Sequence, residues 1–309
     1  METASSNVKK IGKLRRGWEL TKSSWRVVRL DKRLLLLPLM GFVVTCLGMY
    51  LLFSVYMTLV FGTLSIMRDG RAEVFHGHLI LIPFIVLAVL GFFLVFTLSS
   101  LFTGALVYGA NTRFHGGKPT VLGSLKGVSK QFVPLAKFAI VSGSIGMIVQ
   151  IAAERIPFAG KLVAWLGGAA WSVATMFSIP IIVLSDQPVG PIDAVKQSSS
   201  MLKKVWGEGL LVQFGVGTIA GLSVLGYVAL VILASIGLTN VHLPRDVSGP
   251  LFLAAVLGGL LLILVYGTLT TIMRTALYYY AKTGEAPELF NKELLHASMT
   301  VKKARRIFA

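Results

Sequence analysis

Long apolar runs alternate with short polar segments along most of this chain. Six runs stand out, over residues 34–61, 79–110, 132–153, 162–184, 209–238 and 250–281. Each is long enough to cross a hydrocarbon layer of about 30 Å at a rise of about 1.5 Å per residue. Inside lipid, backbone groups must bond within helices or closed barrels, and uninterrupted runs of this length indicate helices. The pattern therefore predicts an all-α membrane protein with six transmembrane helices in a bundle.

Three of the polar segments have a helical pattern of their own, and each begins near a proline, which suits the first turn of a helix. Apolar residues recur at spacings of three and four after Pro119, Pro191 and Pro287. They are Leu122, Leu125, Val128 and Phe132, then Ile192, Val195, Leu202 and Trp206, then Phe290, Leu294, Ala297 and Val301. We expect amphipathic cytoplasmic helices over 119–132, 191–206 and 287–301 that lie along the membrane plane with these stripes buried.

The first 33 residues form a basic segment with a similar pattern. Ile11, Leu14, Trp18, Trp25 and Val28 fall on one side, with Lys and Arg between them. Indole rings prefer the headgroup layer, and basic side chains are attracted to anionic lipid. The predicted lipid interface consists of Trp18, Trp25, Arg15, Arg16, Arg26, Arg29, Lys32 and Arg33. Fixing the topology is the simpler role for these charges, and both roles remain open.

Lys and Arg are distributed unevenly between the two sides that six spans would define. With a cytoplasmic N-terminus, 25 of the 30 fall on the inner side. This bias predicts that both termini are cytoplasmic and that the protein lies in the inner (cell) membrane. The net charge of +17 then reflects topology and attraction to anionic lipid. Nucleic acid is not expected as a partner, because no folded basic domain is present.

Composition agrees with a membrane protein, since 55% of the residues are hydrophobic and only 14% are charged. We divide the chain into a basic segment (1–33), a six-span domain (34–281) and a basic cytoplasmic tail (282–309). The first apolar run is too long for a cleaved signal peptide. A mitochondrial transit peptide is the alternative for the first 33 residues, but Glu2, Glu19 and Asp31 oppose it. The single cysteine, Cys46, provides no disulfide or metal framework.

Two short patterns occur twice. The approach to the first apolar run resembles the approach to the fifth, and Ala-Leu-x-Tyr-x-Ala closes both the second and the sixth. Three repeated hairpins would explain this, and so would chance similarity among Leu- and Ala-rich segments. Small residues at spacings of four also predict close helix packing, within the bundle or between two copies. The glycines of these patterns are Gly217, Gly221, Gly258 and Gly259.

The chain resembles known families over nearly its whole length, and two segments carry the resemblance. The run from Lys22 to Pro38 is similar to the approach to the first span in a family of uncharacterised six-helix bacterial membrane proteins. Ile-Pro-Ile-Ile-Val-Leu-Ser-Asp before residue 187, followed by Pro-Ile-Asp-Ala-Val-Lys-Gln-Ser, is similar to a pattern in the membrane domains fused to glycerophosphodiester phosphodiesterases. The resemblance implies the six-helix architecture. It implies no catalytic residues, because the phosphodiesterase barrel is absent.

The sequence offers few candidates for catalytic or metal-binding residues. Lys137 and Arg274 are the ionisable residues within the runs, and both are near enough to an end to extend toward the membrane surface. No run contains a His that would activate a serine. Glu73, His76 and His78 are conceivable metal ligands, but an ordinary solvated loop explains them better. We therefore expect no catalytic residue, metal or cofactor.

From these patterns we expect a non-enzymatic protein that organises lipid or a partner protein at the inner leaflet. The alternative is a secondary transporter or channel subunit for a small or lipid-like solute. A polar cavity accessible to solute would favour transport. A packed bundle with an extended basic face would favour the organising role.

Overall fold

The computed structural model describes residues 13–68, 78–155, 160–204, 220–234 and 245–299. All regular structure in these ranges is helical, so the expected all-α fold is confirmed. The helices are α2 (Lys13–Leu30), α3 (Arg33–Arg68), α4 (His78–Phe114), α5 (Val121–Ser129), α6 (Phe132–Glu154), α7 (Gly160–Ala174), α8 (Ser178–Leu184), α9 (Pro191–Lys204), the helix Ala220–Ala234, α11 (Arg245–Thr283) and α12 (Lys292–Met299).

Five helical stretches are long and apolar enough to cross a membrane. They are Arg33–Gly62, Leu81–Phe114, Phe132–Glu154, Gly160–Leu184 and Gly249–Thr283. The protein is therefore a multi-pass membrane protein. The fifth expected run is represented by the shorter apolar helix Ala220–Ala234, and residues 209–219 and 235–238 of that run lie outside the described residues. The sixth span thus remains a prediction.

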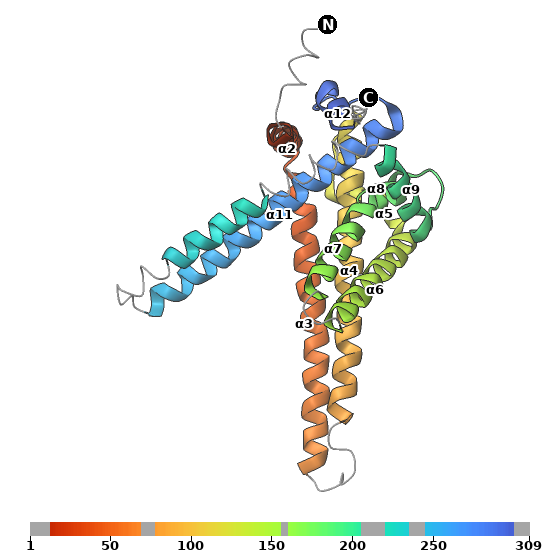
Figure 1. Cartoon of the computed structure of the whole chain (residues 1–309). Helices are drawn as coiled ribbons and strands as arrows, with labels where there is room; N and C mark the ends of the chain where they lie inside the picture. Colours follow the sequence, from red (N-terminus) through yellow and green to blue (C-terminus); the bar gives the residue numbers. More distant parts are fainter. Residues whose placement is uncertain (1–12, 69–77, 156–159, 205–219, 235–244, 300–309) are drawn as a thin grey trace, which may run out of the picture.

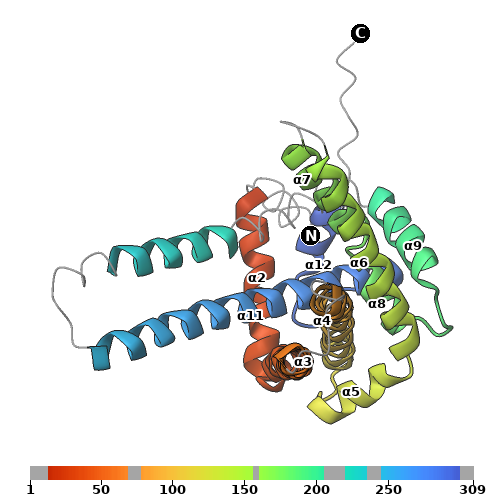
Figure 2. The ribbon, with the colours of Figure 1, turned by 90° about the horizontal axis from the view of Figure 1, so that it is seen from below.

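The long helices form pairs that diverge from one end of the molecule. Helices α3 and α4 lie side by side through the middle, as Figures 1 and 2 show. The helix Ala220–Ala234 and α11 form a second pair that leads away from them, and α6 and α7 form a third pair on the other side. Helix α2 crosses α11 near the end at which the pairs meet. We call this end, with α2, α8, α9, α12 and the adjoining ends of α3, α4 and α11, the crown.

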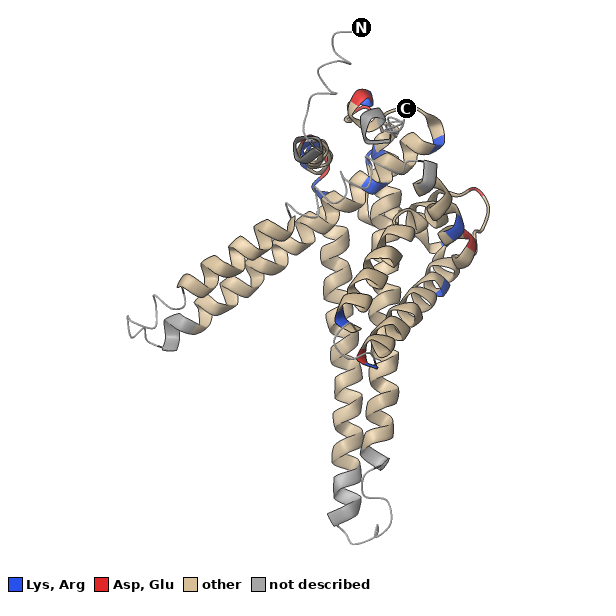
Figure 3. Cartoon of the chain, viewed as in Figure 1, with Lys and Arg blue, Asp and Glu red and all other residues tan. Residues whose placement is uncertain are grey.

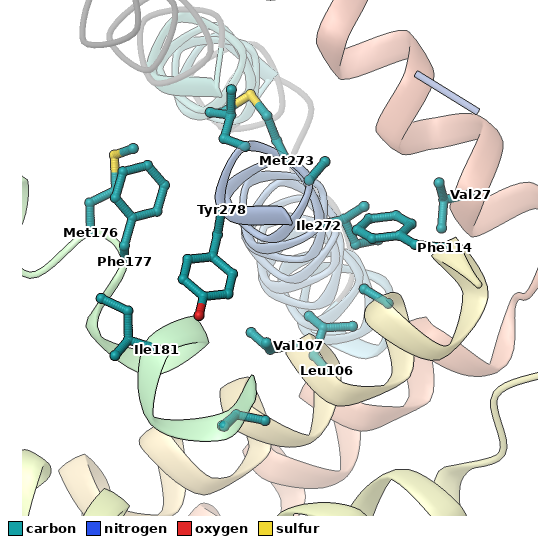
Figure 4. Close-up of a cluster of buried hydrophobic side chains, with 14 of the residues drawn as sticks. Val27, Leu106, Val107, Phe114, Met176, Phe177, Ile181, Ile272, Met273 and Tyr278 are labelled. Carbon is teal, nitrogen blue, oxygen red and sulfur yellow. The ribbon is translucent and has the colours of Figure 1, made fainter. Parts of the chain in front are cut away.

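The buried core lies in the crown rather than in the middle of the spans. Leu34 and Leu37 of α3, Ile272 and Leu277 of α11 and Leu295 of α12 are almost fully buried. Figure 4 shows α11 inside this cluster, with Val27 of α2 on one side and Phe177 on the other. Most apolar side chains farther along the spans are exposed, which suits surfaces that face lipid.

The fourth expected span is interrupted near the crown. Helix α7 ends at Ala174 and α8 begins at Ser178, with a turn between them. Pro180 has no N–H for a helical bond to Met176, so a continuous helix is disfavoured at this point. The amide of Phe177 donates instead to Ser198 Oγ of α9, at 3.0 Å. A side chain from the following helix therefore satisfies a backbone group released by the break.

The three proline-led segments are helical, but the residues that they bury match the predicted stripes only in part. Helix α5 buries Val128 of its stripe together with Ser124, and leaves Leu122 78% exposed. Helix α9 buries Leu202 of its stripe together with Ala194 and Ser198, and leaves Ile192 60% exposed. Small residues take the inner positions because they allow a close approach to the neighbouring helix: Gly127 of α5, for example, abuts the ring of Tyr108. The leucine and isoleucine remain available to lipid.

The third of these helices starts later than predicted. Helix α12 begins at Lys292, after a turn in which the amide of Phe290 donates to Pro287 O at 2.8 Å. Phe290 and Leu294 of the predicted stripe are buried. Val301 and the basic residues that follow it lie outside the described residues.

Candidate functional site: a lipid-facing crown

Helix α2 is attached to the rest of the protein by one face. Leu20, Ser24 and Val27 recur at spacings of four and three and are fully buried, and Val28 beside them is nearly so. They pack toward α11, which α2 crosses (Figure 2). The sequence predicted that Val28 lies on the same side of this helix as Trp18 and Trp25. That prediction is wrong, because Val28 belongs to the buried face. Ser24 is small enough to let the two helices come close.

The opposite face of α2 carries aromatic and basic side chains in one row. Trp18, Lys22, Trp25 and Arg29 follow at spacings of four, three and four, which places them on one face. The exposed fraction is 45% for Trp18 and 36% for Trp25. Lys22 Nζ lies 5.8 Å from the Trp18 ring centroid, and Arg29 Cζ lies 5.7 Å from that of Trp25. Each contact is worth about 0.5–1 kcal/mol at an exposed site. We call these four residues the α2 stripe.

Other predicted interface residues lie near this row. Arg26, Lys32 and Arg33 are exposed on α2 and at the start of α3. Arg15 and Arg16 are within α2, but their side chains are outside the described part of the chain. Figure 3 shows that most of the coloured Lys and Arg lie in the crown, whereas the long helices are almost free of charge along their length. The crown thus presents a basic surface beside apolar spans.

An ion pair that the sequence analysis did not identify joins α2, α3 and α4. Arg113 Nε, in the last turn of α4, lies 3.1 Å from Asp31 Oδ2, between α2 and α3. Arg113 Nη1 also donates to Gly117 O at 3.5 Å. Gly116, with φ of 75°, permits the turn that brings this carbonyl back. Asp31 is an acidic residue in an otherwise basic run. This contrast was the signal in the sequence that could have pointed to an ion pair.

A groove lies between α3, α4 and α11, close below the crown. Its volume is about 350 Å³, within the range of small-molecule sites. Pro38, Gly41 and Thr45 of α3 line one wall, Phe102 of α4 lines another, and Gly267 and Thr271 of α11 line the third. Sequence patterns alone did not reveal it, because a groove depends on how three separate helices meet.

The predicted packing glycines lie in different surroundings. Gly258 and Gly259 face Tyr227 of the neighbouring helix, whose hydroxyl donates to Ala255 O at 2.6 Å. A second link in this pair is the 2.8 Å contact between Ser223 Oγ and Tyr266 Oη. Gly221 has open space around its Cβ position, and Gly217 lies outside the described residues. Close packing within the chain thus involves Gly258 and Gly259.

The ionisable residues within the spans lie toward the crown. Lys137 is exposed in the second turn of α6, and Arg274 is half-buried in α11. Among the described residues, no three His, Cys, Asp or Glu side chains are grouped so that they could hold a metal ion. Glu73 and His76 lie outside the described residues, as does the side chain of His78.

Comparison with known proteins identifies one family. The sequence model of a family of unknown function (DUF6159) matches residues 79–288, about two thirds of the chain. No curated protein and no solved structure matches. The match begins in α4 and ends before α12, so α2 and α3 precede it.

Proposed function

We propose that this chain, which belongs to that family of unknown function, is a non-enzymatic membrane protein that organises anionic lipid at the inner leaflet. The α2 stripe is the observation that carries the proposal. An amphipathic helix at a membrane surface usually buries its whole apolar face in lipid. Here α2 buries one face in the protein and presents a second face made of two indoles and two cations.

The chemistry of the α2 stripe suits a phospholipid headgroup. Indole rings favour the boundary between hydrocarbon and water, and each nearby Lys or Arg adds about 1 kcal/mol of attraction to an anionic surface. Lys22 lies over Trp18 and Arg29 over Trp25, so each cation is held close to an aromatic ring. Because the other face of α2 is packed in the crown, the α2 stripe is ordered before lipid binds, which lowers the entropic cost of binding.

The proposed topology has six spans with the crown in the cytoplasm, in the inner (cell) membrane. The helix Ala220–Ala234 runs beside α11 and is the described part of the fifth span (Figure 1). The crown contains the Lys and Arg that Figure 3 shows at one end, and the positive-inside bias assigns that end to the cytoplasm. A cytoplasmic partner protein bound to the same basic surface is compatible with this role.

One observation favours a second candidate, a transporter or channel subunit for a small or lipid-like solute. The groove between α3, α4 and α11 is a cavity of about 350 Å³ that reaches the membrane-spanning part of the chain. Its lining is mainly apolar. A hydrated solute would find few exposed hydrogen-bonding groups there, so the groove supports the lipid role better than transport of a polar solute.

Tryptophan quenching in the full-length protein tests the organising role. A variant with Trp165→Phe, Trp171→Phe and Trp206→Phe retains only Trp18 and Trp25 as fluorophores. We reconstitute it in bilayers whose lipids carry bromine near the headgroup end of the acyl chain. Stronger quenching in anionic than in neutral bilayers is expected, and added salt should reduce the difference.

A matched pair of charge variants completes the test. Lys22→Gln with Arg29→Gln should remove the preference for anionic lipid. Lys126→Gln with Lys130→Gln, which removes two exposed cations from the region of α5, should preserve it. Equal quenching in neutral and anionic bilayers would leave topology as the only role of these charges.

A further inference from the structure

Helix α2 carries a row of three cations beside its two tryptophans. Lys22, Arg26 and Arg29 follow one another at spacings of four and three residues, so they lie on one face of the helix. All three residues are exposed, whereas Leu20 and Val27 on the opposite face are fully buried. Like charges at these spacings repel one another and weaken an isolated helix, so the row is stabilised when an anion binds to it. We call these three residues the cation row.

The contacts that the cation row already makes leave its charges available. Glu19 Oε1 lies 3.3 Å from Lys22 Nζ, at one end of the row. The side chain of Lys22 is nevertheless 50% exposed, so solvent screens this pair, and the ammonium group has further donors for a second anion. Arg29 Cζ lies 5.7 Å from the centroid of the Trp25 ring, a contact that leaves the N–H donors at the edge of the guanidinium accessible.

The orientation of α2 brings the whole cation row to one depth in the membrane. Helix α2 is seen end-on in Figure 1, where α3 is seen along its length, and Figure 2 shows the reverse. Helix α2 therefore lies across the end of α3 instead of extending it. Only Asp31 and Lys32 separate the two helices, and the apolar span of α3 begins at Arg33. Helix α2 thus lies at the level at which α3 enters the membrane, and its three cations meet the headgroup layer together.

The spacing of the cation row fits two phosphates that are joined to each other. At a rise of about 1.5 Å per residue, Lys22 and Arg26 are about 6 Å apart along the helix axis, and Arg26 and Arg29 about 4.5 Å. Three cations leave two gaps between them, and the centres of these gaps are about 5 Å apart. Two phosphates joined through glycerol are at most about 8 Å apart at bond lengths of about 1.5 Å. They can therefore occupy both gaps at once, and Arg26 borders both.

We propose that the cation row selects a phospholipid with two glycerol-linked phosphates in one headgroup, and that each phosphate occupies one gap. This inference rests on the proposed function and narrows it, because it names the class of anionic lipid that α2 holds. A lipid with one phosphate fills one gap, and a second molecule must bind independently to fill the other. When both phosphates belong to one molecule, the second phosphate binds at a high effective concentration. The guanidinium groups of Arg26 and Arg29 suit this role, since each presents paired donors to phosphate oxygens.

Quenching at matched charge tests this selectivity in the full-length variant that retains only Trp18 and Trp25. One neutral bilayer receives about 2% cardiolipin and another about 4% phosphatidylglycerol, each anionic lipid with brominated acyl chains. Cardiolipin has two phosphates and four acyl chains, and phosphatidylglycerol has one phosphate and two, so the two bilayers carry equal charge and equal bromine. We expect quenching to be about threefold stronger with cardiolipin, because one molecule fills both gaps. This comparison uses one protein, so it does not depend on how a row variant folds.

Arg26→Gln locates the selectivity within the row. Arg26 borders both gaps, whereas the two ring contacts are made by Lys22 and Arg29 and are retained in this variant. The excess quenching with cardiolipin should be largely lost, while both anionic lipids still quench more than a brominated neutral lipid at the same bromine content. Arg26→Lys should restore most of the excess, because it restores the charge. Lys126→Gln, which removes one exposed cation of α5, is the matched control and should leave the excess unchanged.

The outcomes separate this inference from the proposed function. If cardiolipin quenches no more than phosphatidylglycerol at matched charge, but both quench more than the brominated neutral lipid, the two-phosphate selectivity is refuted and the organising role stands. If neither anionic lipid quenches more than the neutral lipid, both are refuted. An excess for cardiolipin that persists in Arg26→Gln, or that is lost equally in Lys126→Gln, would overturn the assignment to the cation row.

Discussion

Arg113 Nε lies 3.1 Å from Asp31 Oδ2, and the two side chains are only 22% and 14% exposed. The pair connects the junction of α2 and α3 with the end of α4. It therefore restrains the C-terminal end of α2, whose buried face sets the direction in which Trp18 and Trp25 face. Because solvent reaches both groups only partly, their attraction is screened less than that of a surface pair.

Removing this pair should destabilise the protein. We expect Arg113→Gln to lower the free energy of unfolding by about 1–3 kcal/mol, between the values typical of exposed and of buried pairs. Lys196→Gln is the control, because Lys196 Nζ is 3.8 Å from Asp193 Oδ1 and both side chains are well exposed. Its effect should be within about 0.5 kcal/mol of zero. Thermal unfolding in detergent measures both, and a double variant with Asp31→Asn should show that the two effects are not additive.

Ser198→Ala should be costly although it removes only one oxygen. Ser198 Oγ accepts from the Phe177 amide at 3.0 Å, and both residues are fully buried. Without the hydroxyl, a backbone N–H at the break between α7 and α8 loses its partner, at about 1–3 kcal/mol. Ser200→Ala, on the exposed side of α9, should change the free energy of unfolding by a few tenths of a kcal/mol at most. Similar melting temperatures for the two variants would contradict the role of Ser198 at the break.

The pair formed by α11 and the helix Ala220–Ala234 depends on a small residue. A Cβ at position 258 would occupy the place of the Tyr227 hydroxyl, so Gly258→Ala should displace Tyr227 and break its bond to Ala255 O. We expect a loss of about 1–3 kcal/mol. Gly226→Ala has open space and should be neutral or slightly stabilising, since Ala favours helix. Hydrogen exchange of the two helices, compared between the variants, is the measurement.

Topology reporters test the proposed orientation. With 25 of 30 Lys and Arg on one side, reporters fused after Ala309 and after Lys118 should indicate the cytoplasm, and one near Asp69 should indicate the outside. An external C-terminus would contradict six spans. The result also decides which leaflet meets the α2 stripe.

The sequence predicted the helices well and their contacts poorly. Helix α6 was placed to within one residue at its end, because hydropathy over a long run is a strong signal. The buried faces of α5 and α9 were predicted only in part. Val128 and Leu202 are buried as expected, but Ser124, Ala194 and Ser198 pack beside them and are too small or polar to be recognised as part of a hydrophobic stripe. Helices approach one another closely where their side chains are small, and hydropathy does not measure side-chain size.

The candidate site, like the fold, was predicted from the sequence only in part. Trp18 and Trp25 were predicted on one face of a helix, and they lie on one face of α2. The local spacing also places Lys22 and Arg29 on this face. The burial of the other face depends on α11, far away in the sequence. The groove and the pairing of Asp31 with Arg113 require three helices or their ends to meet. No single segment of the sequence shows which distant residues complete such contacts.

The location of the core in the crown has a consequence for biosynthesis. Leu34 and Leu37 emerge early from the ribosome, but their partners Ile272 and Leu277 emerge near the end of synthesis. Each helix pair can insert into the membrane as it is made, whereas contacts this distant in sequence must wait for the last span. A chain that stopped before α11 would be inserted yet lack the part of the core that α11 contributes, and its α2 would lose the main helix against which it packs. Quality control of truncated chains would then meet a basic helix whose apolar face is exposed.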